Sequence, residues 1–178
     1  MKNPGLWMYS VGAAFLLSLP WLFLFPGWIL FVGFVPLFFL EERLKQSGDL
    51  VQNRFVFRNH LLLCFGLWNL LSAWWLGYAT SVGLLLFLFL NTLLTTVIWY
   101  LYFRFREKNG NTLSLLFLVG LWLSFEYLHF NWDMQLPGMT LGGVFGTLPE
   151  FVQWYEFSGI LGGSLWILLA NILIFQLS

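Results

Sequence analysis

The chain has 178 residues, of which 60% are hydrophobic and only 9% are charged, and its formal net charge is zero. A soluble domain usually carries about 25% charged residues, and one of this size still leaves roughly a third of its surface exposed to water. The composition therefore excludes an ordinary soluble domain and predicts an all-α, polytopic membrane helix bundle, and the zero net charge gives no reason to expect nucleic acid as a partner.

Four stretches without Asp, Glu, Lys or Arg supply the predicted spans, because a crossing helix needs about 20 mostly apolar residues. The first two stretches are long enough for two crossings each. Pro26-Gly27 divides the first, and the glycine-bounded segment 77–83 divides the second. The sequence thus predicts about six transmembrane helices, at residues 6–25, 28–40, 60–76, 84–103, 112–128 and 160–177.

The positions of the basic residues predict the orientation of these spans. With six crossings, all of them fall on one side: Lys2, Arg43, Lys45, Arg54, Arg58, Arg104, Arg106 and Lys108. This positive-inside pattern predicts that this side, with the N-terminus, is cytoplasmic. The second span is short and contains Pro36, so two interpretations of segment 6–40 stay open. It crosses the membrane twice or forms a re-entrant hairpin, which would preserve the same charge pattern.

Residues 129–159 form the one long segment on the opposite side, and the segment is rich in aromatic and aliphatic residues. Its glycines and prolines interrupt any long helix, and aromatic side chains prefer the headgroup region of a bilayer. Two interpretations follow. The segment lies in the outer interface, with short helical pieces around 148–157 and a lipid-handling site, or it forms a packed cap over the bundle.

An acid within a membrane helix is costly, which makes Glu126, near the outer end of the fifth span, a functional candidate. It shares a helix face with His129, three residues on. Glu126 is predicted either to orient a polar headgroup or dock a partner domain, or to make a structural hydrogen bond to a neighbouring helix. The full set predicted to face lipid, substrate or a docked domain is Glu126, His129, Trp132, Trp154, Tyr155 and Glu156.

No catalytic residue, metal site or cofactor is expected within the chain. Cys64 is flanked by apolar residues, which favours a buried thiol over a nucleophile. His60 and His129 lie on opposite sides of the predicted bundle, so they cannot share a metal ion. The spacing of Asp133 and Glu156 specifies no acid–base pair, and a solvated or capping role is the alternative for both.

Small and polar residues within the spans predict helix packing. Asn69, Asn91 and Asn171 each lie in a different span and are expected to form interhelical hydrogen bonds. Gly162-Gly163-Ser164 is expected to let another helix approach closely.

Four local patterns follow one another along nearly the whole chain. They are Leu19-Pro20-Trp21 continuing to Val35-Pro36-Leu37, Cys64 to Leu76, Trp122 to Tyr127, and Val152-Gln153-Trp154 through Gly162-Gly163-Ser164 to Asn171. The ordered set resembles the N-terminal membrane domain of the apolipoprotein N-acyltransferase family. Glu126 matches the acid of the family's third pattern.

The resemblance implies acyl transfer from a phospholipid to the α-amine of a lipoprotein's diacylglyceryl cysteine, in the bacterial inner membrane, with the outer loop periplasmic. In the family the Glu, Lys and Cys of this reaction lie in a nitrilase-like domain that this sequence lacks, so no catalytic residue is carried over. The expected partners are membrane phospholipids, diacylglyceryl lipoproteins and the nitrilase-like domain, supplied in cis or in trans. The sequence stops directly after its last predicted span, which favours a fragment over a complete protein.

Two other functions stay open. The first is a free-standing membrane scaffold derived from that domain, which binds lipid or a partner without chemistry. The second is a small transporter. Because transporters usually carry ionisable residues near the bilayer midplane, and no Asp, Glu, Lys or Arg lies near a predicted midplane here, a transporter ranks last.

Overall fold

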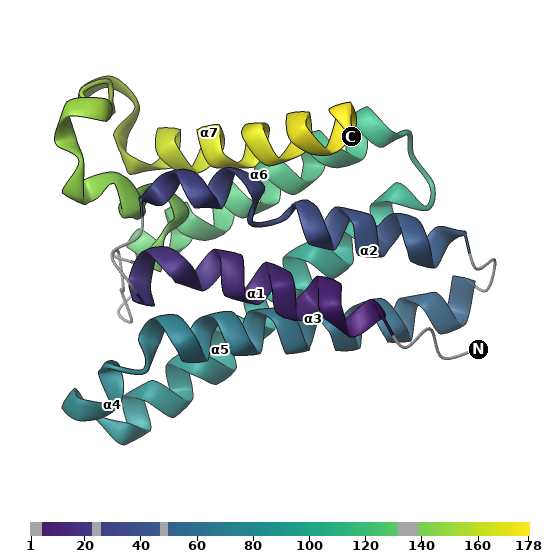
Figure 1. Ribbon diagram of the computed structural model, residues 1–178, viewed down its shortest axis with the longest axis horizontal. Coiled ribbons are helices and arrows are strands. Elements are labelled where there is room, and N and C mark those ends of the chain that lie inside the picture. Colours follow the sequence, from purple (N-terminus) through teal and green to yellow (C-terminus); the bar gives the residue numbers. More distant parts are fainter. Residues whose placement is uncertain (1–4, 23–25, 47–49, 132–138) are drawn as a thin grey trace.

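The computed structural model describes residues 5–22, 26–46, 50–131 and 139–178, and every regular element in these residues is helical (Figure 1). The α-helices are α1 (Leu6–Leu22), α2 (Val35–Lys45), α3 (Leu50–Ala73), α4 (Leu76–Ala79), α5 (Ser81–Arg106), α6 (Asn111–Phe130) and α7 (Tyr155–Leu177). Three 3-10 segments complete the described structure: η1 (Gly27–Val32), η3 (Leu141–Thr147) and η4 (Pro149–Phe151).

Three of the described helices, α5, α6 and α7, are long and apolar enough to cross a membrane, and α1 is a shorter apolar helix. The outward faces carry large apolar side chains. On α5, Val82, Leu85 and Phe89 are each exposed by about two-thirds, at 68%, 66% and 66%. Soluble monomers rarely expose apolar surface on this scale, so these faces suit lipid. The class of the fold, an all-helical membrane bundle, agrees with the prediction, and the number of six crossings stays a prediction.

The helices differ from the predicted spans mainly at their ends. Helix α3 begins at Leu50, before the predicted span that starts at residue 60, and Arg54 in this added part pairs with Glu107 of the α5 C-cap. Helix α7 includes one turn from Tyr155, but Gly159 has a non-helical backbone, so the continuous part of the helix begins at residue 160, where the predicted span also begins. Residues 23–25 of the first predicted span lie outside the described residues.

The second predicted span, 28–40, is a broken element made of η1 and α2. Pro36 stands in the first turn of α2, where its missing N–H costs no helical hydrogen bond. The break leaves the Phe34 N–H without a backbone acceptor, and the Leu30 carbonyl accepts only from the Gly33 N–H of the 3-10 turn, so Asn171 of α7 completes the bonding at the break. Its carboxamide oxygen accepts from the Phe34 N–H at 2.8 Å, and its amide nitrogen donates to the Leu30 carbonyl at 2.6 Å. A side chain from the last helix therefore closes the break, as the apolar setting requires.

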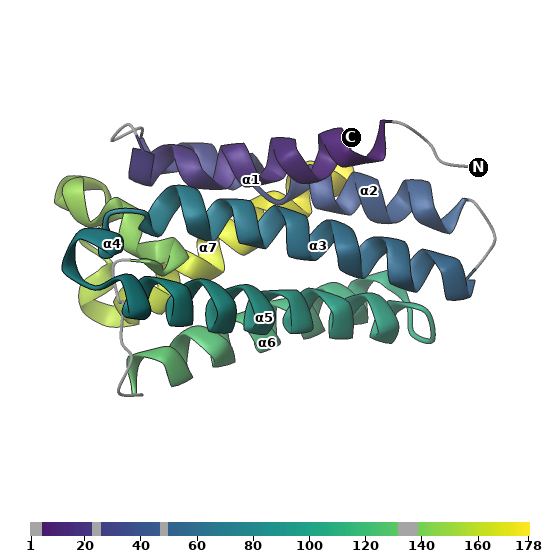
Figure 2. The same ribbon diagram turned by 90° about the horizontal axis from the view of Figure 1, so that it is seen from below.

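The helices form a closed ring rather than a row of hairpins (Figures 1 and 2). Helix α1 packs on α3, α3 on α5, α5 on α6 and α6 on α7, and α7 returns to η1 and α2, which contact α1. The C-terminal end of α2, the N-terminal end of α3 and the connection between α5 and α6 lie at one end of the bundle (Figure 2). Helix α4 and the segments η3 and η4 lie at the other end, so the charged and the aromatic connections are segregated.

Aromatic side chains fill the centre of the bundle. Phe34, at the break between η1 and α2, lies between Trp99 of α5 and Trp122 of α6, with ring centroids 5.4 and 5.2 Å away. Trp122 also stacks on Trp68 of α3 at 6.4 Å. These four side chains are at most 2% exposed, so four elements meet in one aromatic layer.

The predicted interhelical hydrogen bonds of the three asparagines are confirmed. Asn91 of α5 donates to the Asn69 carboxamide oxygen on α3 at 2.7 Å, and Asn69 donates to the Thr92 hydroxyl at 3.0 Å. Asn171 makes the contacts to the broken element described above. Each asparagine thus joins elements that are distant in sequence.

We expect Asn171→Leu to lower the free energy of unfolding by about 1–3 kcal/mol, because it leaves the buried Phe34 N–H without an acceptor and removes one of the two donors to the Leu30 carbonyl. Unfolding in mixed detergent micelles measures this loss. The matched control is Asn131→Leu, at an exposed asparagine that donates only to the Tyr127 carbonyl, and it is expected to stay within about 0.5 kcal/mol. Equal losses in both variants would contradict the role given to Asn171.

Candidate functional site

Glu126 lies in the last turns of α6 and points into the protein, since its side chain is only 2% exposed. One carboxylate oxygen, Oε1, accepts from the indole N–H of Trp122 and from the backbone N–H of Leu141, both at 2.9 Å. The hydroxyl of Ser164 faces the same carboxylate without reaching hydrogen-bond geometry, and Oε2 has no hydrogen-bond partner among the described residues. The carboxylate therefore joins α6 to the beginning of η3.

A second set of contacts joins η3 to α7. The Gly142 N–H donates to the Ser164 hydroxyl at 2.8 Å, and the Tyr155 hydroxyl donates to the Gly142 carbonyl at 2.9 Å. A Cβ at Gly142 would collide with the backbone carbonyl of Ile160 and lie 2.9 Å from the Ser164 nitrogen. Only glycine permits this backbone contact. The close approach predicted at Gly162-Gly163-Ser164 occurs, but its partner is the 3-10 segment rather than another helix.

Aromatic side chains hold the rest of the segment against the bundle. Trp28 of η1 makes edge contacts with Phe145, Phe151 and Trp166, at centroid distances of 5.2, 5.3 and 5.6 Å. Leu141 and Phe145 of η3 are fully buried in the main core. We call residues 139–157, with these anchors, the cap. Two interpretations of the outer segment were left open, and these contacts agree with the one in which it forms a packed cap over the bundle.

His129 lies one turn after Glu126, and its ring contacts Phe125 at 5.7 Å. Both His129 and Glu126 line a cavity of about 10 Å³ between α6, the cap and Trp68 of α3. A cavity needs at least about 10–15 Å³ to hold a single water molecule, so no lipid or organic substrate fits here. The shared helix face is thus correct, and it points toward a packed interior.

Two of the remaining candidate residues, Trp154 and Glu156, lie at the C-terminal end of the cap. Trp154 is half-buried, its indole N–H donates to the Phe151 carbonyl at 3.2 Å, and its ring contacts that of Tyr155 at 4.8 Å. Glu156 is exposed in the single turn of α7 that precedes the kink at Gly159. Trp132 and Asp133 lie outside the described residues.

Neither metal binding nor nucleophilic chemistry is supported by the described part of the chain. No group of three His, Cys, Asp or Glu side chains in it is arranged to hold a metal ion. Cys64 is a free thiol buried in the main core, far from the accessible setting that a nucleophile needs. The described contacts of the cap position it over the bundle and anchor it there.

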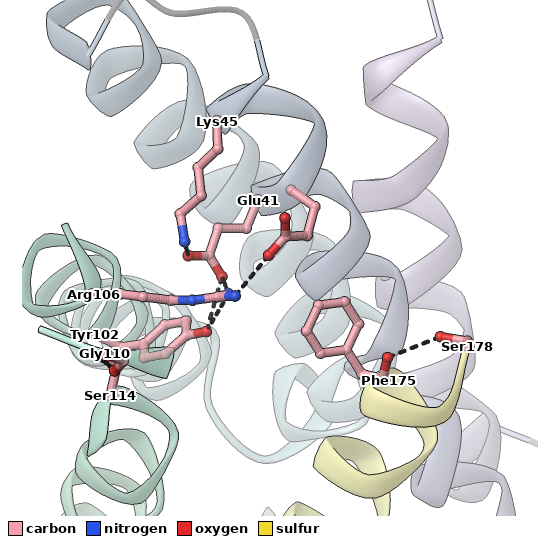
Figure 3. Close-up of polar contacts among 9 residues, drawn as sticks. Glu41, Lys45, Tyr102, Arg106, Gly110, Ser114, Phe175 and Ser178 are labelled. Atoms are coloured by element: carbon pink, nitrogen blue, oxygen red, sulfur yellow. Dashed lines mark hydrogen bonds and ion pairs between the residues drawn. The ribbon is translucent and has the colours of Figure 1, made fainter. Parts of the chain in front are cut away.

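The structure also contains a charged cluster that the sequence reasoning missed, at the opposite end of the bundle (Figure 3). Glu41 is fully buried and accepts from the Tyr102 hydroxyl at 2.9 Å. It pairs with Arg106 and, at 3.0 Å, with Lys45, and Arg106 also pairs with Glu42 at 2.6 Å. The cluster joins α2 to α5. The available signal was the Glu41–Lys45 spacing of four residues, which places both charges on one helix face.

Comparison with known proteins gives a match over most of the chain. The family described as apolipoprotein N-acyltransferase N-terminal domain matches residues 13–173. A curated apolipoprotein N-acyltransferase of Chlorobaculum tepidum is 28% identical over 160 residues. That alignment covers 86% of this chain and 29% of the relative, so the chain spans less than a third of the relative's length. No solved structure matches.

We expect Glu126→Ala to accelerate hydrogen exchange at the Leu141 amide by on the order of tenfold or more, because that amide loses its acceptor. Glu126→Gln keeps one acceptor oxygen and should have a smaller effect. Hydrogen-exchange mass spectrometry of the cap measures both. Glu156→Ala, at an exposed acid of the same region, is the control and should leave the Leu141 amide unchanged. Unchanged exchange in Glu126→Ala would refute the anchoring role.

A second prediction concerns the backbone contact. Gly142→Ala should destabilise the protein by about 1–3 kcal/mol, since the added methyl group meets the backbone of α7. Gly146→Ala is the matched control in the same segment, because a Cβ there meets nothing within 4 Å. Unfolding in detergent compares the two. If both variants were as stable as the parent protein, the close contact between η3 and α7 would not contribute to stability.

Proposed function

The chain belongs to the apolipoprotein N-acyltransferase N-terminal domain family, and from this premise we propose that it is the membrane-embedded portion of a lipoprotein N-acyltransferase. Its role is to anchor a catalytic nitrilase-like domain and to shape the access of lipid substrates to that domain. The observation that carries the proposal is the family match over residues 13–173. The chain itself is not catalytic in this proposal.

The proposed reaction has two lipid substrates. An ester bond of a phospholipid breaks, an amide bond forms at the α-amine of a diacylglyceryl cysteine, and a lysophospholipid is released. Both substrates are held in the membrane, so the enzyme needs a rigid part within the bilayer that fixes the height of the catalytic domain. The cap supports this role because Glu126 and Gly142 bind it to two apolar helices.

The proposal includes a membrane topology. The chain crosses the bacterial inner membrane about six times, with its N-terminus in the cytoplasm and the cap on the periplasmic side. The described basic residues gather at the end opposite the cap, which supports this orientation by the positive-inside rule. Exposed aromatic side chains lie at both ends of the bundle, as the two interfaces of a bilayer favour, with Trp7 and Phe55 at the basic end and a larger set at the cap end: Trp74, Trp75, Tyr78, Phe151 and Phe157. In this orientation the aromatic rim borders the periplasmic leaflet.

The test is an acylation assay on protein purified from native membranes through a tag on this chain. Vesicles of phosphatidylethanolamine supply the acyl donor, and a synthetic diacylglyceryl-cysteine peptide is the acceptor. We expect the peptide to gain the mass of one acyl group while one lysophospholipid appears. The 178-residue chain, produced alone in a heterologous host, should give neither product.

Variants of the cap connect the assay to this chain. Glu126→Ala in the native source should reduce the rate by about tenfold, because a loosened cap misplaces the catalytic domain. Glu156→Ala should keep the parental rate. If the native preparation gives no acylated peptide, the proposal fails, and a membrane scaffold that binds lipid or a partner without chemistry takes its place.

A further inference from the structure

A surface groove runs between α1 and the broken element made of η1 and α2. Its volume is about 750 Å³, and its walls are mostly apolar. Tyr9, Gly12 and Leu16 line it from α1, and Val35, Phe39 and Arg43 line it from α2. Its size falls within the range of about 300–1,000 Å³ that is typical of small-ligand sites.

Gly12 gives the groove its depth. A Cβ at this position would meet nothing within 4 Å, so the missing side chain leaves open space between the two helices. Such an apolar wall offers few hydrogen-bond partners to a water molecule. In a bilayer, lipid acyl chains surround the protein and are the apolar groups available to fill the groove.

Arg43 gives the groove a charged end. It lies in the last turn of α2 and is exposed, and it makes no ion pair among the described residues. The two acids that precede it in α2 are already engaged, because Glu41 pairs with Lys45 and Arg106, and Glu42 pairs with Arg106. A guanidinium with free donors matches the geometry and charge of a phosphate group.

We propose that this groove binds one anionic phospholipid, with an acyl chain lying along Gly12 and its phosphate bound by Arg43. The Arg43 end is also the end at which the described basic residues gather, so the lipid belongs to the leaflet on that side. The site lies at the opposite end of the bundle from the cap. It is therefore a separate lipid site, and it does not depend on the acyl-transfer proposal.

Native mass spectrometry of the purified chain in detergent tests the site. The probes are phosphatidylglycerol and a diacylglycerol with the same acyl chains, which differ only in the charged headgroup. We expect one phosphatidylglycerol to bind about fivefold more tightly than the diacylglycerol, as one basic residue near a lipid surface provides. Arg43→Gln should abolish that preference, and Arg43→Lys should restore most of it.

Gly12→Leu fills the groove and should weaken the binding of both lipids at least tenfold. Two control variants should behave like the parent. Arg58→Gln removes an exposed cation that contacts Asn59 and Phe55, and Gly120→Leu adds the same side chain at an exposed glycine of α6 with open space around it. Matching unfolding temperatures establish that every variant is folded.

Three results would overturn the site. The first is a parent protein that binds neither lipid, or binds both equally well. The second is an Arg43→Gln variant that keeps the preference for phosphatidylglycerol, or a Gly12→Leu variant that binds as the parent does. The third is loss of binding in the two controls as well, which would mean that lipid adheres to the helices without a defined site.

Discussion

The need to pair every backbone polar group inside an apolar solvent is the constraint on which this structure depends. A continuous helix meets it alone, but this fold contains a broken element and a non-helical cap. Asn171 binds the groups freed at the break, and Glu126 and Ser164 bind the first two amides of η3. Each of these polar side chains lies in a long apolar helix and binds the backbone of an irregular segment.

This arrangement assigns different roles to the two ends of the bundle. The cap end is held by single hydrogen bonds and aromatic contacts, with one buried carboxylate. The other end is held by a buried network in which Arg106 joins Glu41 and Glu42 (Figure 3). Removing one member of a buried ion network usually costs about 3–5 kcal/mol, because the remaining charge is left unpaired. The network fixes α2 beside α5, and so it also fixes one wall of the groove that contains Arg43.

Sequence patterns predicted the class of the fold and the fact that the intramembrane asparagines would be paired, since a polar side chain in an apolar helix needs a partner. They did not identify the partners. The break at Gly33 and Phe34 depends on how η1 and α2 meet α7, which no local pattern encodes. Glu41 was placed beyond the end of a span, whereas α2 continues to Lys45 and turns that carboxylate inward. The direction of Glu126 likewise depends on η3, whose position is set by tertiary packing.

The bond between Asn171 and the broken element also has a consequence for biosynthesis. The Phe34 N–H and the carboxamide oxygen that it binds are separated by 137 residues. At a synthesis rate of about 5–20 residues per second, the second element waits roughly 7–30 s for its partner. During that interval the Phe34 N–H lacks this acceptor, and the ring of helices can close only after α7 has been synthesised. Synthesis of the broken element and its final folding are therefore separate events in time.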